Sequence, residues 1–189
     1  MGRHLDVVAP LLDEAELLPP PRWAPEALDT PEAAASLDRL LDHASTSVRA
    51  WAARALGFVP ASRPLPRAAE ALGADADLRV AVTEALARRG HEEAVAQLIA
   101  LLAHDPAPGV RAEALRSLAS LRLEPERLVP PLAAALEDPS PEVVDASVRA
   151  LLRLGPAARP ALPALERLLD SSGRPVSTIV AAAISKLRD

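Results

Sequence analysis

The chain has 189 residues, a formal net charge of −5 at pH 7 and no cysteine. An acidic surface is repelled by nucleic acid, which normally binds a basic stripe, and a chain without cysteine has neither a disulfide framework nor a thiolate site. No apolar run is long enough to span a bilayer, and the first residues lack the apolar core and cleavage site of a secretory signal. We therefore expect a cytoplasmic protein that binds neither nucleic acid nor membrane.

The first 31 residues are predicted to form an N-terminal helix followed by a proline-rich connector. Apolar residues at helical spacing place the helix at about 3–18. Three consecutive prolines from Pro19 then end it, and the connector is expected to place Trp23 against the first hairpin.

The stretch from 91 to 123 contains two amphipathic patterns separated by a turn. Val95, Leu98 and Leu102 lie on one face of the first predicted helix, and Val110 begins the second. Two prolines and a glycine lie between them, a combination that ends one helix and lets another begin in a new direction. Because neither helix is long enough to be stable alone, the hairpin must bury its apolar face on a neighbour.

The same pattern recurs along the chain. The first apolar residues of the second helices are 30, 32, 33 and 33 residues apart: Val48, Leu78, Val110, Val143 and Val176. Self-similarity at this period predicts an all-α fold, an α-solenoid of about five helical hairpins closed by the N-terminal helix. Residues 32–189 would form its single domain, with a short first helix in the second hairpin, near 65–72.

The segments VRAWAARALG, LRVAVTEALA and VRAEALRSLA carry a family resemblance. Each follows a turn, begins with an apolar residue and Arg, and continues into an Ala-Leu-rich helix. The chain resembles HEAT repeats over roughly 32–189, in particular the short bacterial repeats named after phycobilisome lyases. The resemblance implies a solenoid, but this repeat serves scaffolds, chaperones, lyases and hydroxylases alike.

In such proteins, the resemblance implies a ladder of Asp and Arg side chains that bridges turn backbone and neighbouring hairpins. Arg49, Arg79 and Arg111 follow the first apolar residue of three successive second helices, and Asp42 and Asp105 precede two of them. The alternative is a site for an anion or carboxylate. The series ends where Val144 and Ser177 take the equivalent positions.

Catalytic and metal motifs are weak. His91-Glu92 resembles the iron-binding His-Glu motif of HEAT-repeat hydroxylases, but it occurs once and begins a first helix. No GxSxG motif or glycine-rich phosphate loop is present. A bilin pocket is hard to build because Trp23, Trp51 and Phe58 are the only aromatic residues. We expect no catalytic residue, cofactor or metal.

The exposed side of the second helices is predicted to bind another protein, since it mixes charges of both signs. The residues expected to point outward there are Arg54, Val80, Thr83, Glu84, Ala112, Glu113, Arg116, Asp145, Arg149 and Arg153. Trp51 lies at the border of this surface, either as filler or as an anchor for a partner. The last helix carries Ile179 and small residues where a terminal repeat should be polar, so it either caps poorly or docks on something, including a second copy.

The sequence therefore predicts a non-enzymatic adaptor of bacterial origin that binds a protein through the concave ridge of its second helices and through its C-terminal helix. Its candidate contact residues are Trp51, Arg79, Glu113, Arg116, Arg149 and Ile179. The alternative is a partner-dependent lyase or modifying-enzyme subunit of the phycobilisome-lyase type.

Overall fold

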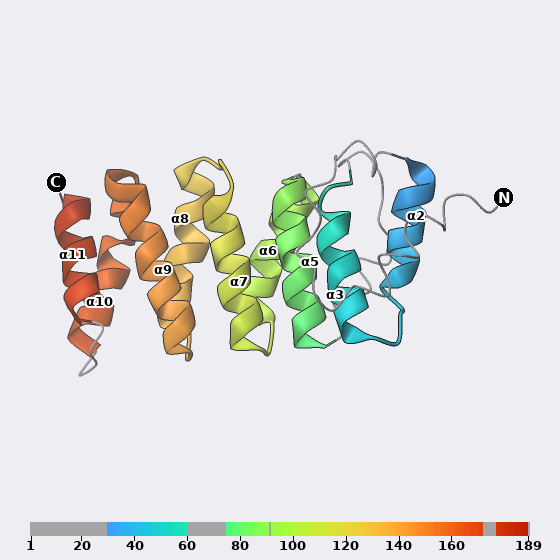
Figure 1. Cartoon of the computed structure of the whole chain (residues 1–189). Helices are drawn as coiled ribbons and strands as arrows, with labels where there is room; N and C mark the ends of the chain where they lie inside the picture. The colour runs from blue at the N-terminus through green and yellow to red at the C-terminus, as the bar shows by residue number, and fades with distance from the viewer. Residues whose placement is uncertain (1–29, 60–74, 91, 172–176, 189) are drawn as a thin grey trace. The chain divides into compact units, whose positions relative to one another are not determined.

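The computed structural model describes residues 30–59, 75–90, 92–171 and 177–188 (Figure 1). Within these ranges every regular element is helical and no strand occurs. The expected N-terminal helix at 3–18, the connector with Trp23, the short helix near 65–72, His91 and Val176 lie outside the described residues.

The chain divides into two compact units, residues 1–94 and 95–189. The single domain over 32–189 stays a prediction. The helix α6 (Glu92–His104) begins at the end of the first unit and continues into the second.

The first unit is built from three described helices before α6: α2 (Pro31–Leu40), α3 (Thr46–Leu56) and α5 (Ala76–Arg89). The Thr30 hydroxyl accepts a hydrogen bond from the Ala33 N–H, which caps α2 as the Thr-Pro-Glu signal predicts. Gly57 lets α3 approach α5, because a Cβ there would lie 2.9 Å from the Ala85 Cα. Gly90 ends α5 with a φ of 60°, the left-handed conformation that glycine adopts without strain.

The second unit continues the hairpin plan with alternating first and second helices (Figure 1). Its elements after α6 are α7 (Pro108–Ser120), α8 (Pro125–Ala134), the 3-10 turn η3 (Ala135–Glu137), α9 (Pro141–Leu154), the 3-10 segment η4 (Gly155–Ala161), α10 (Leu162–Ser171) and α11 (Ser177–Arg188). The helices α7, α9 and α11 are the second helices of successive hairpins. The α-solenoid prediction is therefore confirmed.

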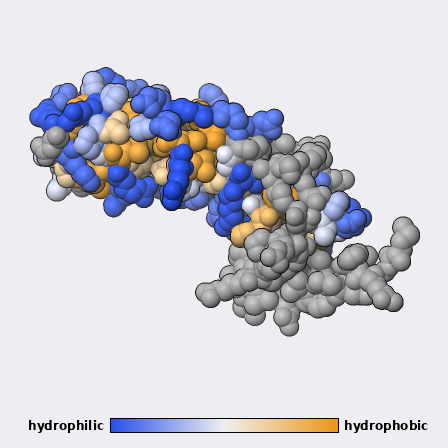
Figure 2. Space-filling model, turned by 90° about the horizontal axis from the view of Figure 1, so that it is seen from above, coloured by the Kyte–Doolittle hydropathy of each residue, from blue (hydrophilic) through white to orange (hydrophobic). Residues whose placement is uncertain are grey.

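The core consists of the periodic positions that the sequence indicates. Val48, Leu78, Val110 and Val143 are each at most 5% exposed. The positions four residues further on are buried in all five second helices: Ala52, Val82, Ala114, Ser147 and Val180. Figure 2 shows hydrophobic residues between hydrophilic edges on the C-terminal side, which is the pattern expected of two helix layers with an apolar seam.

Prolines interrupt one first helix. Pro130 and Pro131 lie inside α8, in the middle of the helix rather than in the first turn, and α8 changes to a 3-10 turn at Ala135. The Ser147 hydroxyl of α9 donates a buried hydrogen bond of 2.5 Å to the Leu132 carbonyl. A neighbouring helix therefore supplies a donor where the backbone of α8 is irregular.

Candidate functional site

A bidentate ion pair joins two hairpins of the second unit. Arg111, near the start of α7, donates from Nε and Nη2 to the two carboxylate oxygens of Asp138, at 2.7 and 2.8 Å. The same guanidinium donates to the Asp105 and Pro106 carbonyls at 2.8 and 3.2 Å. The two side chains are only 11% and 9% exposed. Arg111 thus binds its own turn and the turn that leads into α9.

The electrostatics of this pair follow from its geometry. The hydrogen bonds from Arg111 are the largest cause that lowers the pKa of Asp138, and the Ser140 N–H bonded to the same carboxylate lowers it further. The bond to Asp138 in turn raises the pKa of Arg111. Both groups are therefore charged at neutral pH, and neither is poised for proton transfer.

The first unit contains the equivalent arrangement in a more exposed form. Arg49 donates to the His43 and Ala44 carbonyls at 2.8 and 2.9 Å, and to Asp75 at 3.0 Å. Asp75 is the N-cap of α5 and accepts from the Leu78 N–H at 2.9 Å, which is the largest cause of its lowered pKa. The side chains of Arg49 and Asp75 are 20% and 44% exposed.

The acids that pair with these arginines were not among the sequence candidates. Arg49 and Arg111 bind the acids of the following hairpin, Asp75 and Asp138, whereas Asp42 and Asp105 belong to the turns before them. Asp105 is buried and its carboxylate accepts from the Ala107 N–H at 2.9 Å. Asp138 could have been found because it follows an apolar run and precedes a proline, as Asp105 does.

A mixed-charge surface connects α7 and α9 in the second unit. We call Glu113, Arg116, Glu142, Asp145 and Arg149 the α7–α9 ridge. Arg116 lies 3.0 Å from Glu113 and 3.5 Å from Glu142, so it joins the two helices. Arg149 pairs with Asp145 at 2.7 Å along α9. The structure brings the predicted Glu113, Arg116 and Arg149 onto one ridge, and adds Glu142, which the sequence argument missed.

The charges of the α7–α9 ridge are accessible. The side chains of Arg116, Glu142 and Arg149 are 48%, 55% and 61% exposed. Exposed ion pairs of this kind contribute at most about 1 kcal/mol each to stability. Charged groups of a partner can therefore replace these contacts at little energetic cost. Three acids and two bases alternate on this surface, an arrangement that suits a protein partner better than a polyanion.

The first unit places its candidates differently. Trp51 is half-buried on α3, and Arg79 is half-buried on α5. The helices α3 and α5 are bridged by Arg54 and Glu84 at 2.8 Å. Trp51 and Arg79 therefore lie in a different unit from the α7–α9 ridge, and the structure does not assemble all of the sequence candidates into one patch.

Two residues expected to point outward are buried, so those predictions were wrong. Thr83 and Ala112 are both 0% exposed. The Thr83 hydroxyl donates to the Arg79 carbonyl at 2.7 Å, which satisfies it without water. An inner second helix packs on neighbours on two sides, as α7 does with α8 and α9, and only a narrow strip of it stays exposed.

The described residues contain neither a candidate metal site nor a candidate membrane span. No group of three or more His, Asp or Glu side chains there is arranged to hold a metal ion. None of the helices that the structure describes is long and apolar enough to cross a bilayer.

The fold and the repeated Arg-Asp arrangement define a helical-repeat protein of the α-solenoid class. A family model of HEAT repeats matches residues 65–127 and 97–185, which together exceed half of the chain. The chain belongs to the HEAT repeat family. A comparison with curated protein sequences finds no match.

Solved structures similar to this chain include designed armadillo repeat proteins. One is 22% identical with a TM-score of 0.56, covering 99% of this chain and 95% of that chain. A second, designed for modular peptide recognition, is 21% identical with a TM-score of 0.51 and 82% coverage of both chains. A third, in complex with the peptide (KR)4, is 22% identical with a TM-score of 0.52 and the same coverage. At these identities the likeness concerns the fold alone.

Proposed function

We propose that this protein is a non-enzymatic, cytoplasmic scaffold that binds a segment of another protein along the α7–α9 ridge. The observation that carries the proposal is the ridge itself, where exposed charges of both signs span two second helices. The solenoid fold supports it, since repeat proteins present extended surfaces for binding. A designed protein of similar fold binds the peptide (KR)4.

The Arg111–Asp138 pair would serve this function by fixing the ridge. It joins the start of α7 to the turn that precedes α9. The spacing of Arg116 and Arg149 would then be preorganised in the free protein, which lowers the entropic cost of binding.

The proposal is tested by capturing proteins from a lysate of the native cell. The double variant Arg116→Glu/Arg149→Glu should lose a protein that the unaltered chain retains stoichiometrically. It removes both basic side chains of the ridge and turns its three ion pairs into like-charge contacts. The matched control is Arg122→Glu/Arg167→Glu, which reverses an exposed arginine outside the ridge and breaks the exposed 3.2 Å pair of Arg167 with Glu137. Helical content is compared by circular dichroism for all three chains.

Retention by the control but not by the ridge variant supports the proposal. Equal retention by all three chains, or retention of nothing, overturns it. The partner-dependent lyase alternative would instead give an absorbance change when the chain is mixed with a bilin and the captured protein, whereas a scaffold leaves the bilin spectrum unchanged.

A further inference from the structure

The second helices carry a row of equivalent positions at their C-terminal ends, ten residues after the first apolar residue of each helix. The row consists of Phe58, Arg88, Ser120, Arg153 and Lys186, and all five are exposed. In the first unit the Arg88 guanidinium lies 5.0 Å from the centre of the Phe58 ring, so this base makes a cation–π contact within its own unit. The base of the first unit thus already has a contact inside the protein.

The other two bases of the row lie on α9 and α11, which pack against each other in the second unit. Arg153 is in the last turn of α9, and Lys186 is in the last turn of α11. Gly155 caps α9 two residues after Arg153, and a Cβ at Gly155 would lie 4.0 Å from the Lys186 Cε. The end of the lysine side chain is therefore close to the end of α9 that carries Arg153.

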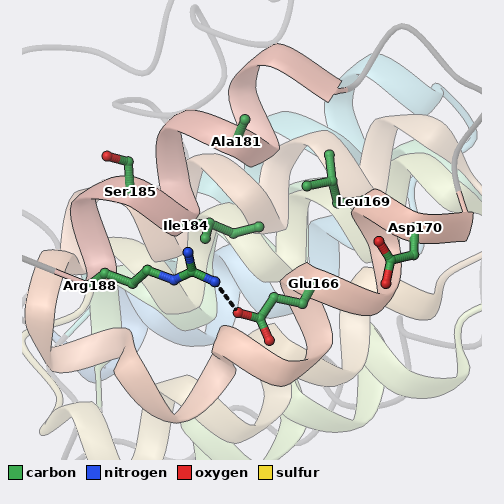
Figure 3. A pocket seen from close by; sticks show the side chains of 7 residues that line it. All are labelled: Glu166, Leu169, Asp170, Ala181, Ile184, Ser185 and Arg188. Atoms are coloured by element: carbon green, nitrogen blue, oxygen red, sulfur yellow. Dashed lines mark hydrogen bonds and ion pairs between the residues drawn. The ribbon is translucent and has the colours of Figure 1, made fainter.

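These two bases have no acidic partner among the described residues. Neither Arg153 nor Lys186 takes part in an ion pair there. Arg188, the other base in the last turn of α11, differs because it lines the groove between α10 and α11 and pairs with Glu166 at 2.6 Å (Figure 3). Arg149 lies one turn before Arg153 on α9 and is also exposed. We call Arg149, Arg153 and Lys186 the basic strip.

A purely structural role accounts for only part of the basic strip. A base in the last turn of a helix interacts favourably with the helix dipole, which explains Arg153 and Lys186. Arg149 lies before the last turn of α9, and its partner Asp145 is on the side away from Arg153 along the helix. Like charges one turn apart destabilise a helix. An anionic group placed above Arg149 and Arg153 removes this repulsion.

We propose that the basic strip binds an acidic stretch of the partner segment, which continues from Arg149 over α9 to α11. This inference rests on the proposed function, because it extends the α7–α9 ridge at a residue that both surfaces share. Carboxylates fit the strip, since the Arg153 guanidinium can donate two parallel hydrogen bonds to one carboxylate and the Lys186 ammonium attracts it as a point charge. Nucleic acid fits less well, because the ridge acids beside the strip repel a continuous row of phosphates.

The probe is a short fluorescent peptide of alternating glutamate and glycine, whose binding to the full chain is followed by anisotropy. The same peptide with glutamine in place of glutamate should not bind. Arg153→Gln/Lys186→Gln should weaken binding of the glutamate peptide about tenfold, the factor that corresponds to losing two exposed ion pairs. The matched control is Arg127→Gln/Arg167→Gln, which removes the same charge from exposed positions on α8 and α10 and should bind like the unaltered chain.

A second pair of variants adds an acid beside the basic strip. Ala182 is exposed one turn before Lys186, at the position equivalent to Arg149. Ala182→Glu should therefore weaken binding of the glutamate peptide. Ala181→Glu makes the same charge change at the neighbouring exposed position, which lines the groove between α10 and α11, and should not weaken it. Circular dichroism and urea denaturation compare the folding of all variants.

Equal effects within either pair of variants, or no binding of the glutamate peptide, would overturn the proposal. A short oligothymidylate serves as the competing anion. Tighter binding of the oligothymidylate than of the glutamate peptide would make a nucleic acid the ligand and would contradict the proposal.

The strip and the ridge proposals fail separately. Arg153→Gln/Lys186→Gln should retain less of the protein captured from the lysate than the control Arg127→Gln/Arg167→Gln does. Equal retention by these two variants would overturn the strip and leave the ridge unaffected. Retention of nothing by the unaltered chain would overturn the ridge, and the peptide measurements would still decide whether the strip binds carboxylates.

Discussion

The two compact units contain the same Arg-Asp connection at different degrees of burial. In the first unit Asp75 is 44% exposed and shares a single 3.0 Å contact with Arg49. In the second unit Asp138 is 9% exposed and accepts two bonds from Arg111. The arginine at the same repeat position thus makes a solvated contact in one unit and an almost fully buried one in the other, so equivalent positions in the sequence need not contribute equally to stability.

The difference also bears on function. The buried pair joins the start of α7 to the turn into α9, the two helices that carry the α7–α9 ridge, whereas Asp75 of the exposed pair caps α5. A rigid connection is useful where a surface must keep its spacing for a partner. We therefore expect the second unit to depend more strongly on its Arg-Asp pair than the first.

The largest effect is expected from removing the acids in turn. Asp138→Ala leaves Arg111 charged and nearly buried without its partner, and should lower the free energy of unfolding by about 3 kcal/mol. Asp75→Ala removes an N-cap and an exposed pair, and should cost about 1 kcal/mol. Urea denaturation followed by circular dichroism measures both. Equal losses in the two variants would contradict the expected difference between the two units.

Acid titration tests the contribution of the Arg111–Asp138 pair in the second unit. The pKa of Asp138 is lowered by Arg111, so the pair stabilises the fold above the unfolded pKa of about 4 and loses this contribution as the pH falls through the folded value. The difference in unfolding free energy between the unaltered chain and Asp138→Asn should be constant from about pH 7 to about pH 5 and shrink below about pH 4. An increase of this free-energy difference on acidification would contradict a lowered pKa of Asp138.

A smaller effect is expected for a neutral hydrogen bond of the same unit. Ser147→Ala leaves the buried Leu132 carbonyl without its donor and should cost about 1–2 kcal/mol at any pH. Ser117→Ala is the matched control, because the Ser117 hydroxyl makes only a 3.5 Å contact with Glu113 and should cost less than about 0.5 kcal/mol. Thermal unfolding measures the loss of stability in each variant. A larger loss in Ser117→Ala than in Ser147→Ala would contradict this prediction.

The fold was predictable because the buried positions of a solenoid recur at the period of the sequence repeat. Each position four residues after Val48 and its equivalents is buried, and periodicity alone identifies it. The partners of Arg49 and Arg111 were harder to predict, because they lie 26 and 27 residues away and depend on how the next turn is placed. Thr83 and Ala112 were misplaced because the exposed strip of an inner helix is narrower than an isolated helix suggests.

The candidate surfaces were predictable only in part. Charge on the second helices indicated Glu113, Arg116 and Arg149, since charged side chains on an otherwise apolar helix are seldom buried and usually lie on its solvent side. The groove between α10 and α11, which Glu166 and Asp170 line, could not be found in this way (Figure 3). Its shape depends on the packing of α10 against α11, which no spacing in either helix specifies.

Because the chain contains no cysteine, one introduced thiol can report on the ridge without competing labels. A single cysteine is introduced at Ala146, a half-buried residue of α9 between Glu142 and Arg149, or, as a control, at Glu126 on α8. The rate of thiol labelling is measured with and without the protein captured from the lysate. We predict that the captured protein slows labelling at Ala146→Cys and leaves labelling at Glu126→Cys unchanged. Protection at Glu126→Cys with none at Ala146→Cys would contradict the ridge proposal.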